Sequence, residues 1–225
     1  MELTDKRLVR IQAASGAVFA LFLIVHLVNL ALATFGPRTY DAAQQTLRRG
    51  YQWAPIELAV VIAPLLIHAA AAVTRIVRRR RRGQQAPSNL VSRLHRASGI
   101  YLLVFFVGHV TATRGASLLY GVYPRFAGIA FTLRWVPAYF WPYYLGLALA
   151  GLFHLVHGLG VALPILGFRA GSTLRRPMLL GAVTLLGGTA LVLGMLAFGG
   201  VFFDVGQPAA SPYARLLVRL GVARP

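Results

Sequence analysis

The chain has 225 residues, and 57% of them are hydrophobic, which is typical of a membrane protein rather than a soluble one. Its 23 Lys and Arg residues against 5 Asp and Glu would indicate nucleic-acid binding in a soluble protein. Here the charges lie in the gaps between apolar runs, so membrane topology explains them better and we expect no nucleic-acid partner. The lack of cysteine excludes disulfides, thiolate-ligated iron–sulfur clusters and thioether-attached haem.

A helix needs roughly 20 residues to cross a bilayer, and five apolar segments of the chain have a comparable length. They comprise residues 12–35, 54–77, 97–114, 140–166 and 178–203. The third is the shortest, and we expect its flanks to extend it. The fifth has no ionisable residue, and its glycines at 187, 188 and 194 would let a neighbouring helix approach closely. The pattern predicts an all-α integral membrane protein with five transmembrane helices in a single membrane domain, residues 1–225.

The connections between these segments predict the orientation. Basic residues favour the cytoplasmic side, and the run of five arginines at 78–82 places the N-terminus inside. That run indicates an anchor on anionic lipid or, alternatively, a docking surface for a cytoplasmic partner. Residues 114–139 are expected to be an aromatic-rich outer loop. Residues 204–225 are expected to be a short outer tail, in which 212–222 would form an interfacial helix.

One motif occurs twice in the chain. It reads Arg, three residues, Ala-Ser-Gly, five residues, Phe, three residues, His, and it begins at Arg10 and again, 83 residues later, at Arg93. Each copy ends in a histidine within an apolar segment, His26 in the first and His109 in the second. Because an ionisable residue is costly inside a membrane, a matched pair indicates a function.

The histidines sort by depth in the bilayer. The first and third helices would run outward, so His26 and His109 lie toward the outer face. The second and fourth run inward, so His68 and either His154 or His157 lie toward the inner face. At about 1.5 Å per residue, these outer and inner levels are roughly 10–20 Å apart. Neutral imidazole is a good ligand for haem iron, so the pattern predicts two bis-histidine haems stacked across the membrane.

Residues near the histidines are expected to accommodate the haems. Small residues in the motif, Gly16 and Gly99, leave room for the macrocycle beside a stripe of aromatic side chains. Arg114, five residues after His109, is the best outer candidate to pair with a propionate. The sixth histidine, His95, lies just before the third segment among arginines, and we expect it to be solvated.

These residues resemble a known family, the single-subunit, five-helix, di-haem cytochrome b anchor of succinate dehydrogenase and fumarate reductase. The resemblance covers roughly residues 8–167. The matching pieces are Ser15-Gly16 with Phe22 to His26-Leu27, Ile56-Glu57-Leu58 with Pro64 to His68-Ala69, Ala97-Ser98-Gly99 with His109-Val110, and Leu152-Phe153-His154 with Gly158-Leu159. The order of the histidine helices and the histidine-free fifth helix also agree.

The resemblance implies a set of four iron ligands. His26 and His109 would hold the distal haem, and His68 and a fourth-helix histidine the proximal one. The family pattern Phe-His-x-x-[Asn or Gly]-Gly aligns the fourth ligand with His154, and His157 is the alternative. The cofactor-binding set also includes Ser15, Gly16, Ser98, Gly99 and Arg114. The first four helices would form the haem-binding bundle, and the fifth would pack alongside.

The resemblance also implies an activity and partners. The chain would be the quinone-reactive membrane subunit of succinate dehydrogenase in a bacterial inner membrane. Flavoprotein and iron–sulfur subunits would bind its cytoplasmic face, and menaquinone or ubiquinone would react in the bilayer, with an outer site near Trp53, Glu57 and Arg114 as one candidate. Some fumarate reductase anchors carry a glutamate two residues before the fourth ligand, but this chain has Leu152 there, or Leu155 if the ligand is His157. A proton pathway of that type is therefore not expected.

Three other functions are compatible with parts of this pattern. A stand-alone di-haem transmembrane reductase would use the same ligands without partner subunits. A haem-free transporter or channel would use the histidines as proton relays. A purely structural anchor that has lost its haems would not need the complete histidine set.

Overall fold

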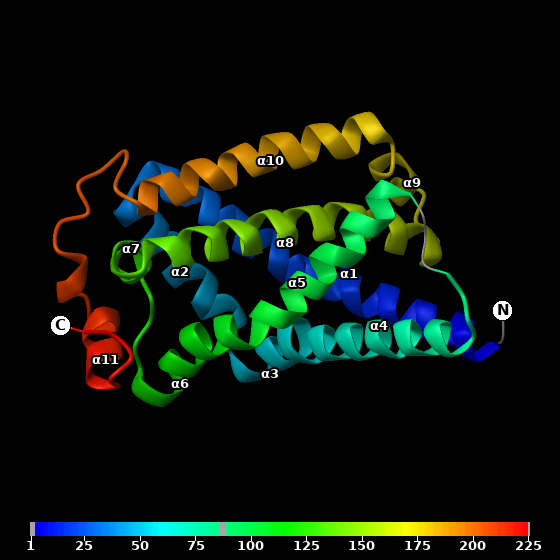
Figure 1. Ribbon diagram of the computed structural model, residues 1–225, viewed down its shortest axis with the longest axis horizontal. Helices are drawn as coiled ribbons and strands as arrows, with labels where there is room; N and C mark the ends of the chain where they lie inside the picture. Colours follow the sequence, from blue (N-terminus) through cyan, green and yellow to red (C-terminus); the bar gives the residue numbers. More distant parts are fainter. Residues whose placement is uncertain (1–2, 86–88, 225) are drawn as a thin grey trace. The chain divides into compact units, whose positions relative to one another are not determined.

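The computed structural model describes residues 3–85 and 89–224, and within these ranges the chain forms helices and no strand (Figure 1). Five helical stretches are long and apolar enough to cross a membrane: Asp5–Phe35, Ala54–Arg81, Leu90–Tyr120, Pro137–Ile165 and Pro177–Phe198. These stretches correspond to the five predicted segments. The protein is therefore an all-α, multi-pass membrane protein, as predicted.

Three of the five stretches are built from consecutive helical elements. The first joins α1 (Leu3–Leu32) to the 3₁₀ turn η1 (Ala33–Phe35). The second joins α3 (Ala54–Ile56), the π-helical η2 (Glu57–Ile62) and α4 (Ala63–Arg81). The third joins α5 (Leu90–Val110), the π-helical η3 (Thr111–Gly115) and α6 (Ala116–Tyr120), so flanks do extend the shortest predicted segment. The fourth and fifth are α8 (Pro137–Ile165) and α10 (Pro177–Phe198).

The connections contain further helices. They are α2 (Pro37–Tyr51), α7 (Phe126–Trp135), α9 (Ala170–Leu174), the 3₁₀ turn η4 (Pro208–Ala210) and α11 (Pro212–Arg219). The prediction of a loop over residues 114–139 was therefore wrong in part, since α7 lies within it. An apolar sequence and an anchored start explain α7, because the backbone N–H of Phe126 donates to Asp41 Oδ1 at 2.9 Å.

The chain divides into two compact units. The first contains the described residues of 1–26, 47–100 and 150–186, and the second contains those of 27–46, 101–149 and 187–225. Consequently α1, α2, α5, α8 and α10 each contribute residues to both units.

Polar contacts join α1 to α4 in the first unit. Asp5 accepts hydrogen bonds from Arg78, at 3.4 Å, and from Arg82. Nearer the middle of the same two helices, the guanidinium of Arg75 on α4 donates to the side-chain oxygen of Gln12 on α1. Part of the basic run at 78–82 is thus bound to the start of α1 as well as available to partners or lipid.

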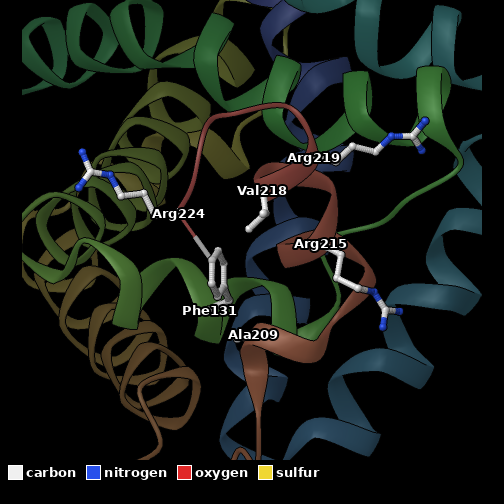
Figure 2. A pocket seen from close by; sticks show the side chains of 6 residues that line it. All are labelled: Phe131, Ala209, Arg215, Val218, Arg219 and Arg224. Atoms are coloured by element: carbon white, nitrogen blue, oxygen red, sulfur yellow. The ribbon is translucent and has the colours of Figure 1, made fainter.

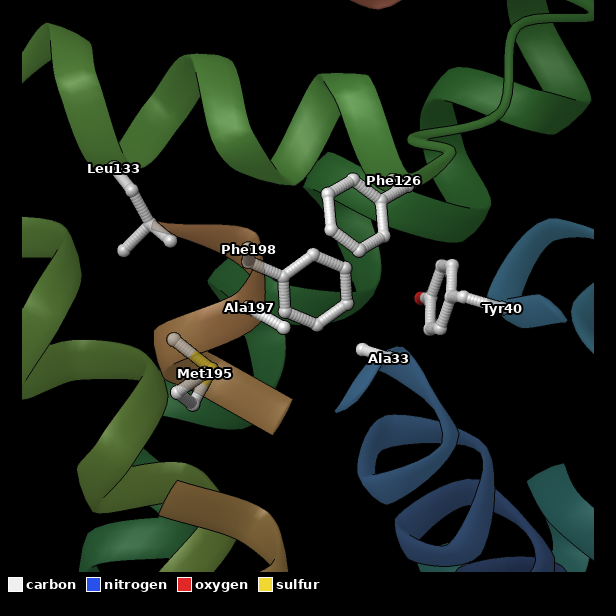
Figure 3. Packing of buried hydrophobic residues seen from close by; sticks show 7 residues of the cluster. All are labelled: Ala33, Tyr40, Phe126, Leu133, Met195, Ala197 and Phe198. Atoms are coloured by element: carbon white, nitrogen blue, oxygen red, sulfur yellow. The ribbon is translucent and has the colours of Figure 1, made fainter. Parts of the chain in front are cut away.

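Aromatic side chains dominate the core of the second unit (Figure 3). Its buried cluster consists of Ala33, Tyr40, Phe126, Leu133, Met195, Ala197 and Phe198. The Phe198 ring lies 4.5 Å from that of Phe126 and meets that of Tyr40 edge-on at 4.9 Å, measured between centroids. The shorter helices α2 and α7 therefore pack on the end of the fifth transmembrane helix through this cluster.

The C-terminal helix α11 lies within residues 212–222, where the sequence predicted an interfacial helix. Its apolar residues Tyr213, Ala214 and Leu216 are buried, and the helix contacts α7 and η4. Burial raises the pKa of the Tyr213 phenol, which keeps the hydroxyl protonated as a donor to the carbonyl oxygen of Ala112 at 2.9 Å. These apolar side chains of α11 are thus covered by protein.

Candidate functional site

Four histidines gather in the first unit. They are His68 on α4, His95 on α5, and His154 and His157 on α8. The rings of His68 and His154 face each other at right angles, with centroids 6.2 Å apart. His95 stacks on His154 at 4.1 Å, with only 10° between the ring planes, and lies 4.5 Å from His157.

His68 is held against α1 by the first copy of the repeated motif. Its Nδ1 lies 2.9 Å from the carbonyl oxygen of Gln12, and since a carbonyl only accepts, Nδ1 carries the proton. A Cβ atom at position 16 would lie 2.6 Å from that same Nδ1, a distance that real Cβ contacts essentially never show. Gly16 is therefore the residue that lets the imidazole reach the backbone of α1.

His154 is held against α5 in the same way by the second copy. Its Nδ1 lies 3.2 Å from the carbonyl oxygen of His95 and 3.2 Å from Ser98 Oγ. Ser98 Oγ itself donates to the His95 carbonyl at 2.8 Å, which leaves it able to accept from Nδ1–H. A Cβ atom at Gly99 would lie 2.8 Å from Cε1 of His154.

The two copies of the motif thus make equivalent contacts. Gln12 and His95 both precede the motif glycine by four residues, and each offers its carbonyl to a histidine of another helix. A hydrogen bond from Nδ1–H to a carbonyl fixes the tautomer and leaves Nε2 with its lone pair free to bind a metal. In the neutral form, both predicted inner ligands would therefore present an unprotonated Nε2, as coordination requires.

The spacing of the two rings also fits a shared metal ion. A metal–imidazole nitrogen bond is about 2.0–2.1 Å, so two imidazoles on opposite sides of one metal ion have centroids roughly 6 Å apart. The centroid distance of 6.2 Å between His68 and His154 has that length. Both donors are neutral imidazoles, the ligands of bis-histidine haem iron, so the residues present fit a b-type haem at this level.

His157, the alternative fourth-helix ligand, has different neighbours. Its ring packs on Phe153 at 6.0 Å and on His95, while His154 is the α8 histidine in ring contact with His68. Among the described residues, Nδ1 of His157 and Nδ1 of His95 are both buried without a hydrogen-bond partner. The geometry favours His154 over His157 as the partner of His68.

The expectation that His95 is solvated was wrong. Its side chain is only partly exposed and stacks on His154, because α5 begins at Leu90 and carries position 95 onto the surface that meets α8. A signal for this was present in the sequence, since His95 occupies the motif position that Gln12 occupies in the first copy.

The residues predicted for the outer level have fewer described contacts. His26 stacks on Phe22 at 5.5 Å, and Phe22 meets Tyr51 edge-on at 5.2 Å. The His109 carbonyl accepts from Thr113 Oγ1 at 2.7 Å. His26 belongs to the first unit and His109 to the second, so their pairing stays a prediction.

Three other predicted residues are placed as follows. Ser15 turns its hydroxyl back onto its own helix and donates to the Ile11 carbonyl at 2.7 Å. Arg114 lies in the π-helical η3 and donates to Ser117 Oγ at 3.1 Å. Glu57, at the start of η2, is buried.

A separate pocket lies in the second unit, beside α11 (Figure 2). It is lined by Phe131, Ala209, Arg215, Val218, Arg219 and Arg224. Figure 2 shows the side chain of Arg224 extending to one side and those of Arg215 and Arg219 to the other, so the three guanidinium groups do not converge on a single anion. None of the predicted site residues lines this pocket.

No protein-family model, curated protein or solved structure matches this chain.

Proposed function

We propose that this chain is the cytochrome b membrane-anchor subunit of a succinate:quinone oxidoreductase. It would carry electrons through two bis-histidine b haems between an iron–sulfur subunit and a membrane quinone. One observation carries the proposal: His68 and His154 face each other at 6.2 Å, each with Nδ1 held by the carbonyl at the same position of a duplicated motif. Packing alone gives no reason for two separate helices to present tautomerically matched imidazoles to each other.

Each residue has a defined role in this proposal. His68 and His154 would hold the inner haem, and His26 and His109 would hold the outer one. Haem supplies reversible one-electron chemistry when bound. The chain fixes the orientation of the imidazoles through the carbonyls of Gln12 and His95 and surrounds the site with apolar helices that keep water away. It has no cysteine, so iron–sulfur clusters and succinate oxidation would reside on partner subunits.

The charge distribution supports the proposed location. The arginines at 78–82 and the start of α1 lie at the same end of the α1–α4 pair, as the Asp5 contacts with Arg78 and Arg82 require. Basic residues gather on the cytoplasmic side of bacterial inner-membrane proteins, which would place the N-terminus, the inner haem and the docking face for the partners there. The quinone would be menaquinone or ubiquinone.

A stand-alone di-haem transmembrane reductase is the second candidate, because it would use the same four ligands. The two differ in their partners. Purification from native membranes in mild detergent would bring down a flavoprotein and an iron–sulfur protein with the anchor subunit, and neither with the stand-alone enzyme.

The test is a reduced-minus-oxidised visible spectrum of the detergent-purified chain, with a pyridine haemochrome count, after expression with adequate haem. We expect two low-spin b haems per chain. His26→Ala and His109→Ala should each remove one and the same haem, and His68→Ala the other. A colourless wild-type protein would exclude the proposal and favour a proton-relay role for the histidines.

A further inference from the structure

We infer that each copy of the repeated motif positions the inner-level histidine of a different helix, and not the histidine in which the copy itself ends. The first copy holds His68 and the second holds His154. This inference rests on the proposed function, because it concerns how the ligands of the inner haem are oriented. It assigns positioning roles to Gly16, Gly99 and Ser98.

Steric contacts carry the first step. The gaps of 2.6 Å from a Cβ at Gly16 to His68 and of 2.8 Å from a Cβ at Gly99 to His154 are too short for alanine. An alanine would have to push the imidazole away from the helix. Because Nδ1 of each ring is held by a carbonyl one turn earlier, the displacement would break that bond and move Nε2 together with the ring.

The chain provides a matched control on α5. Gly108 lies on the same helix as Gly99, directly before His109, and a Cβ there would meet nothing within 4 Å. An alanine at 108 changes helix propensity and bulk in the same way as an alanine at 99. The difference between the two variants therefore isolates the contact with His154.

The two positioning sites are unequal, which gives a second, milder test. Ser98 Oγ lies within hydrogen-bond distance of His154 Nδ1, whereas Ser15 Oγ donates to the carbonyls of Ile11 and Gln12 on its own helix. His95 adds a parallel stack on the face of His154, and the equivalent Gln12 side chain instead accepts from Arg75. Removal of the hydroxyl should therefore matter at position 98 and not at position 15.

The experiment uses the full-length chain purified in detergent, with haem stoichiometry and the midpoint potential of each haem as readouts. The His68→Ala variant identifies the inner haem. Gly16→Ala and Gly99→Ala should weaken retention of that same haem by about 10–100-fold, the usual effect of losing an outer-shell partner, and leave the outer haem unchanged. Gly108→Ala should match the wild type.

We expect the serine variants to retain both haems, so they keep the inference testable if the glycine variants do not fold. Ser98→Ala should shift the midpoint potential of the inner haem alone, and Ser15→Ala should shift neither. If Gly16→Ala instead altered the haem that His26→Ala removes, each copy would serve its own histidine and the inference would be wrong. If the wild type binds two haems and the glycine and serine variants match it in haem content and midpoint potentials, this inference alone is overturned. A wild type without haem would overturn the proposed function.

Discussion

His154 and His157 lie one helical turn apart on α8, and their neighbours separate their roles. His154 has its Nδ1 held by the His95 carbonyl, and its ring contacts that of His68, in keeping with the proposed ligand role. His157 packs between His95 and Phe153. Because the two histidines are three residues apart, their expected depths in the bilayer do not separate them. Their contacts with neighbouring helices do.

This contrast predicts different results for two neighbouring substitutions. His154→Ala should remove the inner haem, because it deletes a ligand, and His157→Ala should leave both haems bound, since it deletes a neighbour of His95. Haem stoichiometry per purified chain measures both. Retention of two haems by His154→Ala, with loss of one in His157→Ala, would reverse the assignment.

The helices of the second unit meet closely at small residues. A Cβ at Gly194 on α10 would lie 2.4 Å from the backbone carbonyl oxygen of Leu30 on α1 and 3.4 Å from Cα of Ala31. Such a contact is between backbones, so no side chain can rotate away to make room. Close approach at glycine is a common mode of helix association in membranes, and the prediction of this role for Gly194 agrees with the contact.

Gly194→Ala is therefore expected to destabilise the protein by about 1–3 kcal/mol, the usual cost of forcing extra volume into a packed interface. Gly181→Ala is the control, since a Cβ at that position of the same helix would meet nothing within 4 Å. Thermal unfolding in detergent, followed by helix content, compares the two. Equal melting temperatures would show that α1 and α10 do not depend on this contact.

At the scale of the whole molecule, five crossings of the bilayer would put the residues before the first span and those after the fifth on opposite sides. The distribution of arginines predicts which side is which. Gln84, after the basic run, should face the cytoplasm, and Gln207, after the fifth helix, should face the outside. Both side chains are exposed.

The lack of cysteine makes the orientation directly measurable. A membrane-impermeant maleimide should label Gln207→Cys in intact spheroplasts and Gln84→Cys only in inverted vesicles, while the wild type remains unlabelled in both. The opposite pattern would invert the topology, and it would place the inner histidines on the side away from cytoplasmic partners.

The sequence by itself determined the five membrane-length helices, and it predicted a depth order for the histidines, because both depend on local properties. Length and apolarity of a continuous run decide whether a helix can span a bilayer, and a rise of about 1.5 Å per residue converts position into depth. The glycine at position 16 was likewise visible in the sequence, because both copies of the internal repeat have glycine at that position. The sequence did not show that this glycine contacts the imidazole of His68.

Only the tertiary structure decided which groups meet across helices. His68 reaches Gln12, His154 reaches His95, and α11 buries Tyr213 beside Ala112, although each pair is separated by more than fifty residues. Such contacts depend on the rotation and register of whole helices, which an apolar run does not encode locally. For the same reason, the sequence did not predict that His95 lies in the histidine cluster. The candidate ligands themselves were identified from their positions in the chain.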